Sequence, residues 1–387
     1  MTPSGAAAGR RRSRREPDRI LVLNAGSSTL KASLLRRGVE EPLGSVTVTW
    51  DGDPATAADG ALTRVLAALG DPPVDDLLGA GHRVVHGGPD LVAPVVIGAA
   101  ALAAIEGVTT LAPLHIPPAL AVIKALTRRA PALLQVACFD TAFHARLPEV
   151  SRRYPVPDAW FTADGIRRYG FHGLSVQWSV GRAATLLERR PGQVRLVVAH
   201  LGAGASVTAV DRGRSVHTSM GFTTQEGLMM ATRSGSIDPG VIFARLRDGR
   251  RTVASVEADL VRESGLLGVG GSADMRALMV RAAAGDRAAR LAIDMFVDRA
   301  ADAIAGAATR LRALDGVVFT AGIGEHAGPV RRAIVRRLAT LGVAPIGASA
   351  RRGDVVLSAP DARPAVIRVE AREDLVIAAA VANAARR

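Results

Sequence analysis

The sequence has almost no cysteine: Cys138 is the only one among 387 residues. An internal disulfide is therefore excluded. Small secreted scaffolds are usually cross-linked by several disulfides, so we expect a protein of the reducing cytoplasm. We predict that Cys138 is a small, buried, apolar residue.

Long apolar runs are also missing. No uninterrupted run approaches the ~18 residues that a membrane-spanning helix requires, and the arginine-rich residues 9–15 are not followed by the apolar segment of a secretory signal. We therefore predict no insertion into a membrane. Residues 1–18 are interpreted as a disordered basic tail.

Aromatic residues and lysines are scarce. Aromatics make up 3% of the chain, and Lys31 and Lys124 are the only lysines, although the formal net charge is +13. Proteins that bind single-stranded nucleic acid interleave basic and aromatic residues, whereas here the arginines are spread through predicted helices such as residues 331–337. We expect no nucleic-acid partner, and the positive charge fits small anionic substrates.

Apolar residues, by contrast, form 48% of the sequence, and glycine occurs 40 times. A chain of this length and apolar content exceeds what one hydrophobic core usually organises, which predicts two domains. Abundant small residues with few aromatics favour close packing of helices on sheets, so we predict an α/β fold.

Two stretches have the pattern of β-hairpins with glycine-rich turns. The first runs from a strand at residues 20–23 through a turn at 24–29 into an alternating strand at 30–35. The same order of strand, glycine turn and alternating strand recurs at residues 196–210. Because one such hairpin opens each half of the chain, we predict duplicated domains that face each other across a cleft.

Helical patterns follow in the second half of the chain. A strand and glycine turn at residues 316–325 lead into a predicted helix at 327–341, so the turn is expected at a helix N-terminus, where anions bind well. A terminal helix is predicted at 373–387, and prolines place the hinge near residues 144–157. A long core helix is predicted at 287–314, with an apolar stripe of Leu291, Met295, Ala301, Ile304, Ala308 and Leu311.

The first hairpin turn has the composition of a phosphate site. A glycine turn after a strand leaves backbone N–H groups free to bind phosphate, and residues 24–29 add three hydroxyls and an amide, with Lys31 close behind. The pattern is not that of a P-loop, which requires GxxxxGK followed by Ser or Thr. A plain hairpin turn is the alternative.

Residues 81–88 place Arg83 between His82 and His86 and end in paired glycines. A buried strand would be mostly apolar, so this segment is either the edge of an active site or a strand with polar surface ends. The spacing of the two histidines suits a metal only on a helix, which the glycines disfavour. We therefore exclude a zinc site.

Three further polar residues are candidates for chemistry. Asp140 follows the apolar residues 133–137, at the carboxyl end of a predicted strand where open α/β sheets bind ligands, although an aspartate there can also cap a helix. His172 is flanked by glycines in residues 167–175, which we predict to be a loop outside the core. Arg233 has small polar neighbours, so its guanidinium can grip phosphoryl oxygens; a surface ion pair is the alternative.

Nine ordered segments together resemble the acetate kinase family over nearly the whole chain after the tail. They are LNAGSSTLK, GHRVVHGG, APLH, FDTAFH, RRYGFHG, HLGAGAS, TSMGFT with EGLMM and TRSG, FTAGIGE, and EDL. The resemblance implies two related ribonuclease H-like (actin-like ATPase) domains that close around a cleft over ATP and magnesium. We assign residues 19–145 plus 373–387 to the first domain and residues 146–372 to the second.

The resemblance also implies roles for individual residues. The implied catalytic residues are Arg83, Asp140, His172 and Arg233. The magnesium side is matched by Asn24 and Glu373. The implied acyl site consists of Arg83, Val85, Leu114, Phe171 and Thr224. The implied ATP contacts are Ser27, Thr29, Lys31, His200, Gly202, Gly204, Asp274, Met275, Arg276, Gly322, Ile323, Gly324 and Glu325.

Several positions depart from the family pattern. In the nucleotide loops, Ala203 and His326 replace asparagines and Met275 replaces a phenylalanine. In the acyl pocket, Thr224 stands where proline is usual. The remaining replacements border the matching segments and are His217 for aspartate, Ile116 for asparagine, and Leu174 and Val176 for threonine and histidine. These changes affect the regions that set nucleotide binding and the size of the acyl pocket.

A carboxylate substrate is already ionised at neutral pH, since its ordinary pKa is ~4, so its attack on the γ-phosphorus needs no general base. Catalysis must then come from positioning and charge. We assign transition-state stabilisation to Arg83, Arg233 and His172. Asp140 is expected to orient an arginine or to hold a metal-bound water.

The expected activity is reversible transfer of the γ-phosphoryl group of ATP to acetate, with Mg²⁺ or Mn²⁺ as cofactor. A propionate or butyrate kinase is one alternative, because one methylene contributes only about 1–3 kcal/mol to discrimination. A non-catalytic, actin-like nucleotide-binding protein is another. The expected partners are acetate, ATP and a second copy of the chain in a homodimer.

Overall fold

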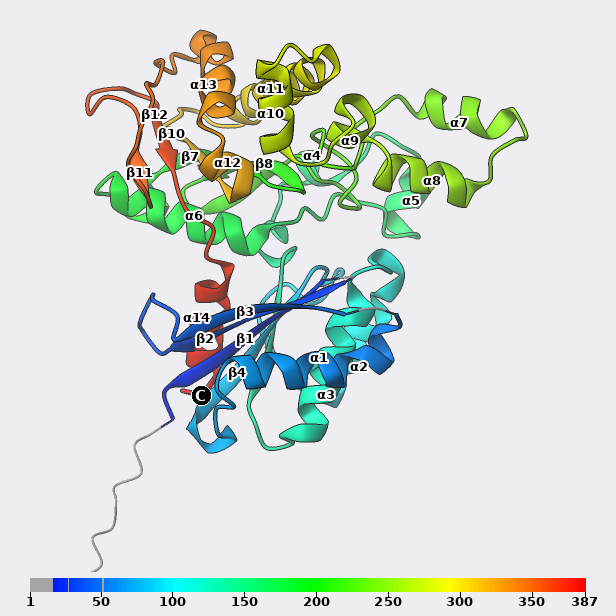
Figure 1. The fold of residues 1–387 in the computed structure, drawn as a ribbon, viewed down its shortest axis with the longest axis vertical. Coiled ribbons are helices and arrows are strands. Elements are labelled where there is room, and N and C mark those ends of the chain that lie inside the picture. The colour runs from blue at the N-terminus through cyan, green and yellow to red at the C-terminus, as the bar shows by residue number, and fades with distance from the viewer. Residues whose placement is uncertain (1–16, 27, 51) are drawn as a thin grey trace, which may run out of the picture.

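The computed structural model describes residues 17–26, 28–50 and 52–387. Most of the predicted tail, and Ser27 of the predicted phosphate turn, therefore lie outside the described residues. The described chain forms two α/β halves, one above the other, and each is built on a six-stranded sheet (Figure 1). Within the described ranges, no helix is both long and apolar enough to span a membrane.

The first sheet has the strand order β3-β2-β1-β4-β6-β5. Strands β1 to β3 form an antiparallel meander, β4 and β6 continue the sheet parallel to β1, and β5 pairs antiparallel with β6. The bounds are Arg19–Ala25 (β1), Thr29–Arg36 (β2), Gly44–Thr49 (β3), Leu77–Val84 (β4), Val95–Val96 (β5) and Gln135–Phe139 (β6).

The second sheet repeats this plan. Its order from one edge is β9-β8-β7-β10-β12-β11, with β7 to β9 antiparallel, β10 and β12 parallel to β7, and β11 antiparallel on the edge. The predicted duplication is therefore confirmed strand by strand. The bounds are Arg195–Leu201 (β7), Ala205–Asp211 (β8), Arg214–Thr218 (β9), Gly316–Thr320 (β10), Val355–Val356 (β11) and Ala365–Arg368 (β12).

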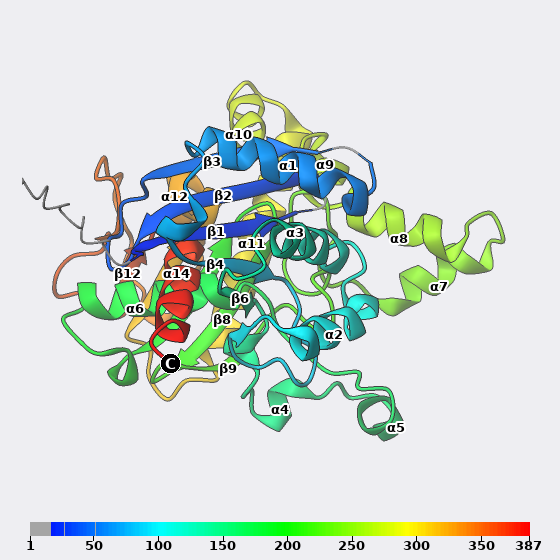
Figure 2. The ribbon, with the colours of Figure 1, turned by 90° about the horizontal axis from the view of Figure 1, so that it is seen from below.

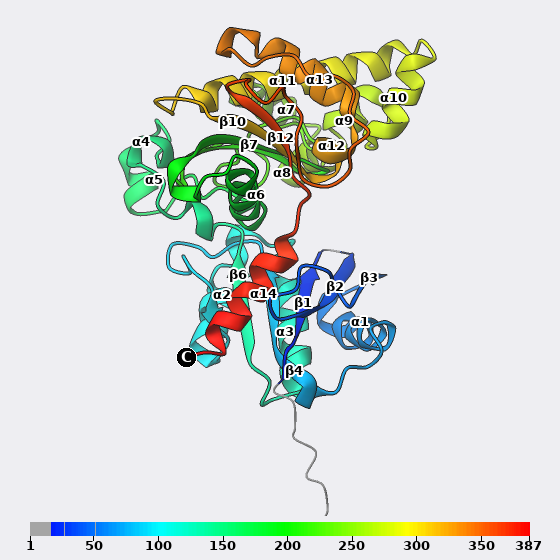
Figure 3. The same cartoon turned by 90° about the vertical axis from the view of Figure 1, so that its left-hand side faces the viewer.

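Helices cover the sheets and join the halves. In the first half α1 and α3 pack on one face of the sheet and α14 on the other (Figures 2 and 3), where they join separate buried clusters; in the second half, the strands contact α6 and α11. The bounds are Pro54–Ala68 (α1), Ala99–Gly107 (α2), Ile116–Arg129 (α3), Glu149–Arg152 (α4), Asp158–Thr162 (α5), Gly173–Leu186 (α6), Pro239–Arg247 (α7), Val253–Arg262 (α8), Gly265–Gly270 (α9), Met275–Ala283 (α10), Arg287–Ala308 (α11), Ala321–His326 (α12), Gly328–Arg337 (α13) and Glu373–Ala384 (α14).

The chain passes between the halves twice. It leaves the first sheet after β6, and it returns after β12 into α14, which lies against the first sheet (Figures 1 and 3). Between the two sheets α14 packs on α6, and Leu174 of α6 joins a buried cluster with Cys138 and Ile377. Cys138 is a buried free thiol, as predicted. The exact domain limits stay a proposal.

The long helix differs from its prediction in length and in its buried face. It ends at Ala308, and Leu291 and Met295 of the predicted stripe are 54% and 36% exposed. The buried face is instead built from small residues with Phe296 and Ile304, because alanines let the helix lie close to the sheet. The prediction was therefore wrong for Leu291 and Met295, because alanines occupy the buried face in their place.

The glycine segment after β10 also differs. It was predicted as a turn, yet residues 321–326 form the short helix α12, which begins directly at the end of the strand. Ala321 takes a left-handed φ of 64°, which turns the chain from strand into helix without a connecting loop.

Candidate active site

Arg83 lies among oxygen-bearing side chains where β1, β4 and β6 end. The carboxyl ends of parallel strands meet at one edge of a sheet, and this register sets Asn24 of β1 beside Arg83 of β4. Asp140 directly follows β6, so its predicted place at a strand end is confirmed. These three strand ends thus bring together side chains that are distant in the sequence.

Three side chains hold the guanidinium of Arg83. Its Nε donates to Asp140 Oδ1 at 3.0 Å and its Nη2 to Asp140 Oδ2 at 2.5 Å. Its Nη1 donates to Asn24 Oδ1 at 3.2 Å, and Glu373 Oε2 lies 3.4 Å from Nε. Asp140 is 1% exposed. Two parallel N–H bonds to one carboxylate fix both the position and the plane of the guanidinium.

The charges of this cluster support each other. Burial lowers the pKa of Arg83, but Asp140 and Glu373 raise it by more, so it lies well above its usual value and the group stays cationic. Burial raises the pKa of Asp140, and the adjacent Arg83 opposes that rise. Because both carboxylate oxygens accept from Arg83, Asp140 has the geometry of a group that orients an arginine.

His172 and His200 stack face to face in the second half, with ring centroids 3.9 Å apart. Nδ1 of His172 lies 3.0 Å from the hydroxyl of Ser206, and Nδ1 of His200 lies 2.8 Å from that of Ser175. Burial, together with His200 and the arginines nearby, lowers the pKa of His172 well below its usual value; burial brings the pKa of His200 to about 4. Both rings are therefore neutral at pH 7.

The turn between β7 and β8 brings His172 and Arg233 together. A Cβ at Gly204 would lie 3.3 Å from Nε2 of His172 and 3.8 Å from Nη1 of Arg233. Nη1 of Arg233 donates to the carbonyl of Thr224 at 2.9 Å, and no acidic side chain of the described residues pairs with this arginine. The predicted alternative, a surface ion pair, is thus absent from the described part of the chain.

His115 belongs to this site, although no role was predicted for it. It precedes α3, and the pKa of its ring is lowered by burial first and then by the charges of Arg233 and Arg83, while Asp140 opposes them. The ring thus lies in the electrostatic field of both arginines. Beyond the matching segment APLH, no sequence signal singles it out.

The implied acyl-site residues are only partly brought together. Val85 and Phe171 belong to the same buried cluster of the second half, although Val85 follows β4 of the first. Thr224 is half-buried, and its carbonyl holds Arg233. Leu114 is 48% exposed on the turn before α3, outside that cluster. The side chains that would define a pocket therefore come from both halves.

The segment around Tyr169 corrects two predictions. Residues 167–172 are a loop, but Tyr169 and Phe171 are buried, and α6 begins at Gly173. His86 is buried as well, with its ring edge-on to both aromatic rings at 4.5 and 5.4 Å. The view of residues 81–88 as a strand with polar surface ends was therefore wrong.

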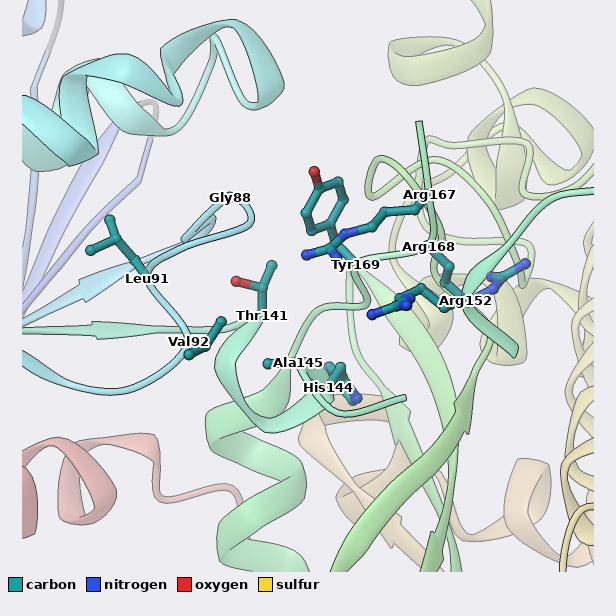
Figure 4. A pocket seen from close by; sticks show the side chains of 10 residues that line it. All are labelled: Gly88, Leu91, Val92, Thr141, His144, Ala145, Arg152, Arg167, Arg168 and Tyr169. Carbon is teal, nitrogen blue, oxygen red and sulfur yellow. The ribbon is translucent and has the colours of Figure 1, made fainter. Parts of the chain in front are cut away.

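Beside these rings lies a hollow lined by arginines. Figure 4 shows the loop with Gly88 and Leu91 on one side and arginines of the second half on the other, with the side chain of Arg167 against the ring of Tyr169. The centre of the Arg167 guanidinium is 4.7 Å from that ring's centroid. This hollow lies between the paired-glycine loop and the segment that carries His172.

The implied nucleotide contacts of the second half lie at the end of β7, on the turn after it, on α12 and at the start of α10. The turn at Gly202 abuts the start of α12, since a Cβ at Gly202 would lie 3.5 Å from that of Ala321. Gly322, Ile323, Gly324 and Glu325 all belong to α12. Asp274 caps α10 by accepting from the amide of Arg276 at 2.9 Å. Met275 is buried in the core, so its side chain contacts protein.

Oxygen donors for a metal line a hollow beside Arg83. Asn24, Glu373 and Asp374 border it together with Lys31 of β2. Among the described residues, no group of three or more His, Cys, Asp or Glu side chains is arranged to bind a metal. An amide and carboxylates fit a hard cation such as Mg²⁺, which takes one or two protein carboxylates and completes its shell with water and substrate phosphates.

Buried histidines predict a loss of stability in acid. Burial lowers the pKa of His82, His144 and His200 to about 4, whereas the unfolded chain titrates near 6.5. The unfolded state therefore binds more protons between these values, so the free energy of unfolding should fall as the pH drops from about 6.5 to about 4, on the order of 1–3 kcal/mol per histidine. Urea unfolding at several pH values measures this.

A matched variant tests the assignment. Nε2 of His82 bonds the side-chain oxygen of Gln135 at 2.9 Å, and glutamine at position 82 keeps a donor but cannot titrate. His82→Gln should therefore lose less stability than wild type over the same pH range. A free energy of unfolding that stays constant from pH 6.5 to 4.5 contradicts the prediction.

Comparisons with known proteins agree with this geometry. The model of the Acetokinase family matches residues 47–379. An acetate kinase of Deinococcus radiodurans is 43% identical over 384 residues, covering 92% of this chain and 96% of the relative. One from Rhodopseudomonas palustris is 41% identical over 389 residues, with 93% and 97% covered.

Comparison with solved structures leads to the same family. The chain superposes on the Porphyromonas gingivalis acetate kinase with a TM-score of 0.87 and 31% identity, over 95% of this chain and 99% of the other. A propionate kinase from Francisella tularensis gives a TM-score of 0.84 and 32% identity, with the same coverage. These matches establish the two-domain, actin-like α/β architecture, and the chain belongs to the acetokinase family.

Proposed function

We propose that this chain is an acetate kinase, which transfers the γ-phosphoryl group of ATP reversibly to acetate. The observation that carries the proposal is that both halves meet at His172. The backbone carbonyl of Asp140, whose side chain holds Arg83, accepts from the amide of Gly173 at 2.8 Å, and Arg233 lies at the Gly204 turn beside the His172 ring, which stacks on His200. Burial and His200 lower the pKa of the His172 ring, and the charges of both arginines lower it further. Such an arrangement suits a trigonal, negatively charged phosphoryl group between two domains.

The proposed mechanism requires no proton transfer at the nucleophile. Acetate attacks as an anion, so Arg83 and Arg233 neutralise charge on the phosphoryl oxygens and the acetate, and His172 donates from a neutral ring. Asp140 keeps the Arg83 guanidinium in one orientation. Because the hydrogen bonds are arranged before the substrate arrives, they cost no reorganisation when charge develops.

Mg²⁺ is the proposed cofactor, with Mn²⁺ as a substitute. Asn24 and Glu373 would hold it directly or through water, since both line the hollow beside Lys31. When bound, the ion neutralises phosphate charge on the nucleotide. The proposed homodimer, the cytoplasmic location and the domain limits rest on family resemblance and chain topology.

A propionate kinase is the second candidate. The Francisella protein of that name superposes nearly as well as the Porphyromonas acetate kinase. The two activities would share the phosphoryl-transfer groups and differ in the acyl pocket, where Thr224 replaces the usual proline.

We expect acetate and propionate to be accepted and butyrate to be a poor substrate. Phe171 and Val85 are buried and provide bulk, so we expect the second methylene of butyrate to fit poorly, and each methylene is worth about 1–3 kcal/mol. A coupled assay of acyl phosphate formation with acids of two to four carbons measures kcat/KM for each. A steady rise from two to four carbons contradicts the pocket, and no acyl phosphate from any acid supports the non-catalytic alternative.

A further inference from the structure

A long irregular segment carries much of the site. Between the end of β9 at Thr218 and the start of α7 at Pro239 the chain has no helix or strand, yet Met220, Met229 and Met230 are buried in the core. The segment includes Thr224 and Arg233. Without regular backbone pairing, side chains must fix its path.

Glu226 lies at the centre of the side-chain contacts that fix the path of this segment. One carboxylate oxygen accepts from Nη2 of Arg168 at 2.5 Å, and the other accepts from the hydroxyl of Tyr154. These three side chains come from separate parts of the chain, and Glu226 is the one that joins the other two. Burial raises the pKa of Tyr154, and Arg168 and Glu226 act on it in opposite directions, so its hydroxyl stays a donor.

Both partners of Glu226 bind the backbone of the segment. Nη1 of Arg168 donates to three successive carbonyls, those of Thr218, Ser219 and Met220, at 3.2, 3.0 and 3.1 Å. The hydroxyl of Tyr154 accepts from the amide of Phe222 at 2.8 Å. The path from 218 to 222 is therefore fixed by two side chains that share one carboxylate.

Gly221 shows how closely this carboxylate lies against the backbone. A Cβ there would lie 1.7 Å from Glu226 Oε2 and 2.0 Å from the Tyr154 hydroxyl, so no side chain fits. The carbonyl of Gly221 accepts from the amides of Tyr169 and Gly170 at 3.0 and 3.3 Å. The contact thus extends to the loop that ends at His172; Figure 4 shows Arg168 and Tyr169 side by side in it.

The same segment determines the position of Arg233. Thr224, two residues before Glu226, provides the carbonyl that accepts from Nη1 of Arg233 at 2.9 Å. Among the described residues, this carbonyl is the one oxygen to which the side chain of Arg233 donates a hydrogen bond. A shift at Glu226 therefore moves both the acceptor of Arg233 and the side chain of Thr224 in the acyl site.

We propose that Glu226 is a positioning residue, which through Arg168 and Tyr154 holds the 218–226 segment so that Arg233 and Thr224 meet the substrate. The proposal rests on the proposed function. It assigns to Glu226 an effect on turnover and on acyl-chain preference, without contact with ATP. A merely structural residue would change stability and leave the preference between acids unaltered.

Three full-length variants test it. Glu226→Gln keeps the size but replaces one of the two accepting oxygens with an NH2 group, which faces a donor, and Tyr154→Phe removes one link. Glu149→Gln is the control, because Glu149 pairs with Arg153 in a nearby, exposed ion pair. We expect Glu226→Gln to lower kcat about 10- to 100-fold, since displacements of about 1 Å cost up to this much. The KM for ATP should stay within about twofold, and the ratio of kcat/KM for propionate to acetate should change at least about threefold.

Tyr154→Phe should show the same changes to a smaller degree, and Glu149→Gln none. Hydrogen exchange followed by mass spectrometry should show faster exchange in residues 218–225 for Glu226→Gln, including the amide of Phe222, whether or not the chain makes acyl phosphate. If the wild-type chain makes no acyl phosphate, the proposed function fails. The hydrogen-exchange result still decides whether Glu226 holds the 218–226 segment in place. Unchanged exchange, or an unchanged acid preference with wild-type kcat, overturns the proposal. If Glu226→Gln does not fold, Tyr154→Phe decides.

Discussion

Replacing Arg233 with alanine should lower kcat by about 10³-fold or more, with much smaller changes in the KM for acetate and ATP. Its guanidinium has a carbonyl as its oxygen acceptor and no carboxylate partner among the described residues, so it is available to the transferring phosphoryl group. A contact that strengthens as charge develops affects kcat more than ground-state binding. Burial lowers the pKa of Arg233, but the group remains cationic.

Two further variants make this test specific. Arg233→Lys should recover only part of the loss, because an ammonium restores the charge but not two parallel hydrogen bonds. Arg247→Ala, an exposed arginine of α7, should keep wild-type kinetics. A folded Arg233→Ala enzyme that retains more than about a tenth of kcat removes Arg233 from the mechanism, since a tenfold step is only ~1.4 kcal/mol of barrier.

The duplicated architecture could be predicted because its signals are local. Each hairpin has alternating strands around a glycine turn, and these features depend on a few neighbouring residues. Asp140 was placed correctly for a related reason, since an apolar run followed by a polar residue marks a strand end. The order of the parallel strands was not readable, because it depends on contacts between β1, β4 and β6 that are distant in the sequence.

Burial was the property most often misjudged. His82 and His86 are polar and were compatible with a surface, but each ring has partners in other elements: Gln135 for His82 and two aromatic rings for His86. Leu291 is apolar and was expected inside, yet alanines take the sheet-facing positions of α11. Residue type alone does not show which face a neighbouring element will cover.

The site itself was predicted through family resemblance more than through chemistry. The sequence signals for Asn24, Arg83, Asp140 and Arg233 were each compatible with a plain structural role. The structure adds contacts that link them, such as the pairing of Arg83 with Asp140, but it also contributes His115 and Glu226. The groups that surround these two residues are distant in the sequence, so neighbouring residues alone do not reveal them.

Asp140→Asn should reduce kcat about 10- to 100-fold, as is typical when the group that orients a reacting residue is changed. Asparagine keeps the shape, but its amide group would face the N–H donors of Arg83, so one of the two parallel bonds is lost. Arg83 then remains attached to Asn24 and Glu373 in a shifted orientation. Because the pair is buried, the free energy of unfolding should also fall, by about 1–3 kcal/mol.

The pH dependence separates this role from that of a general base. If Asp140 only orients Arg83, the residual activity of Asp140→Asn should have the wild-type pH profile, whereas loss of a base would remove the acidic limb of kcat. Asp59→Asn is the matched control, since Asp59 pairs with Arg128 at 2.5 Å but both side chains are about 60% exposed. Such exposed pairs contribute about 0–1 kcal/mol, so the control should change neither kcat nor stability measurably. A profile that flattens only in Asp140→Asn would assign proton transfer to Asp140 and contradict the orienting role.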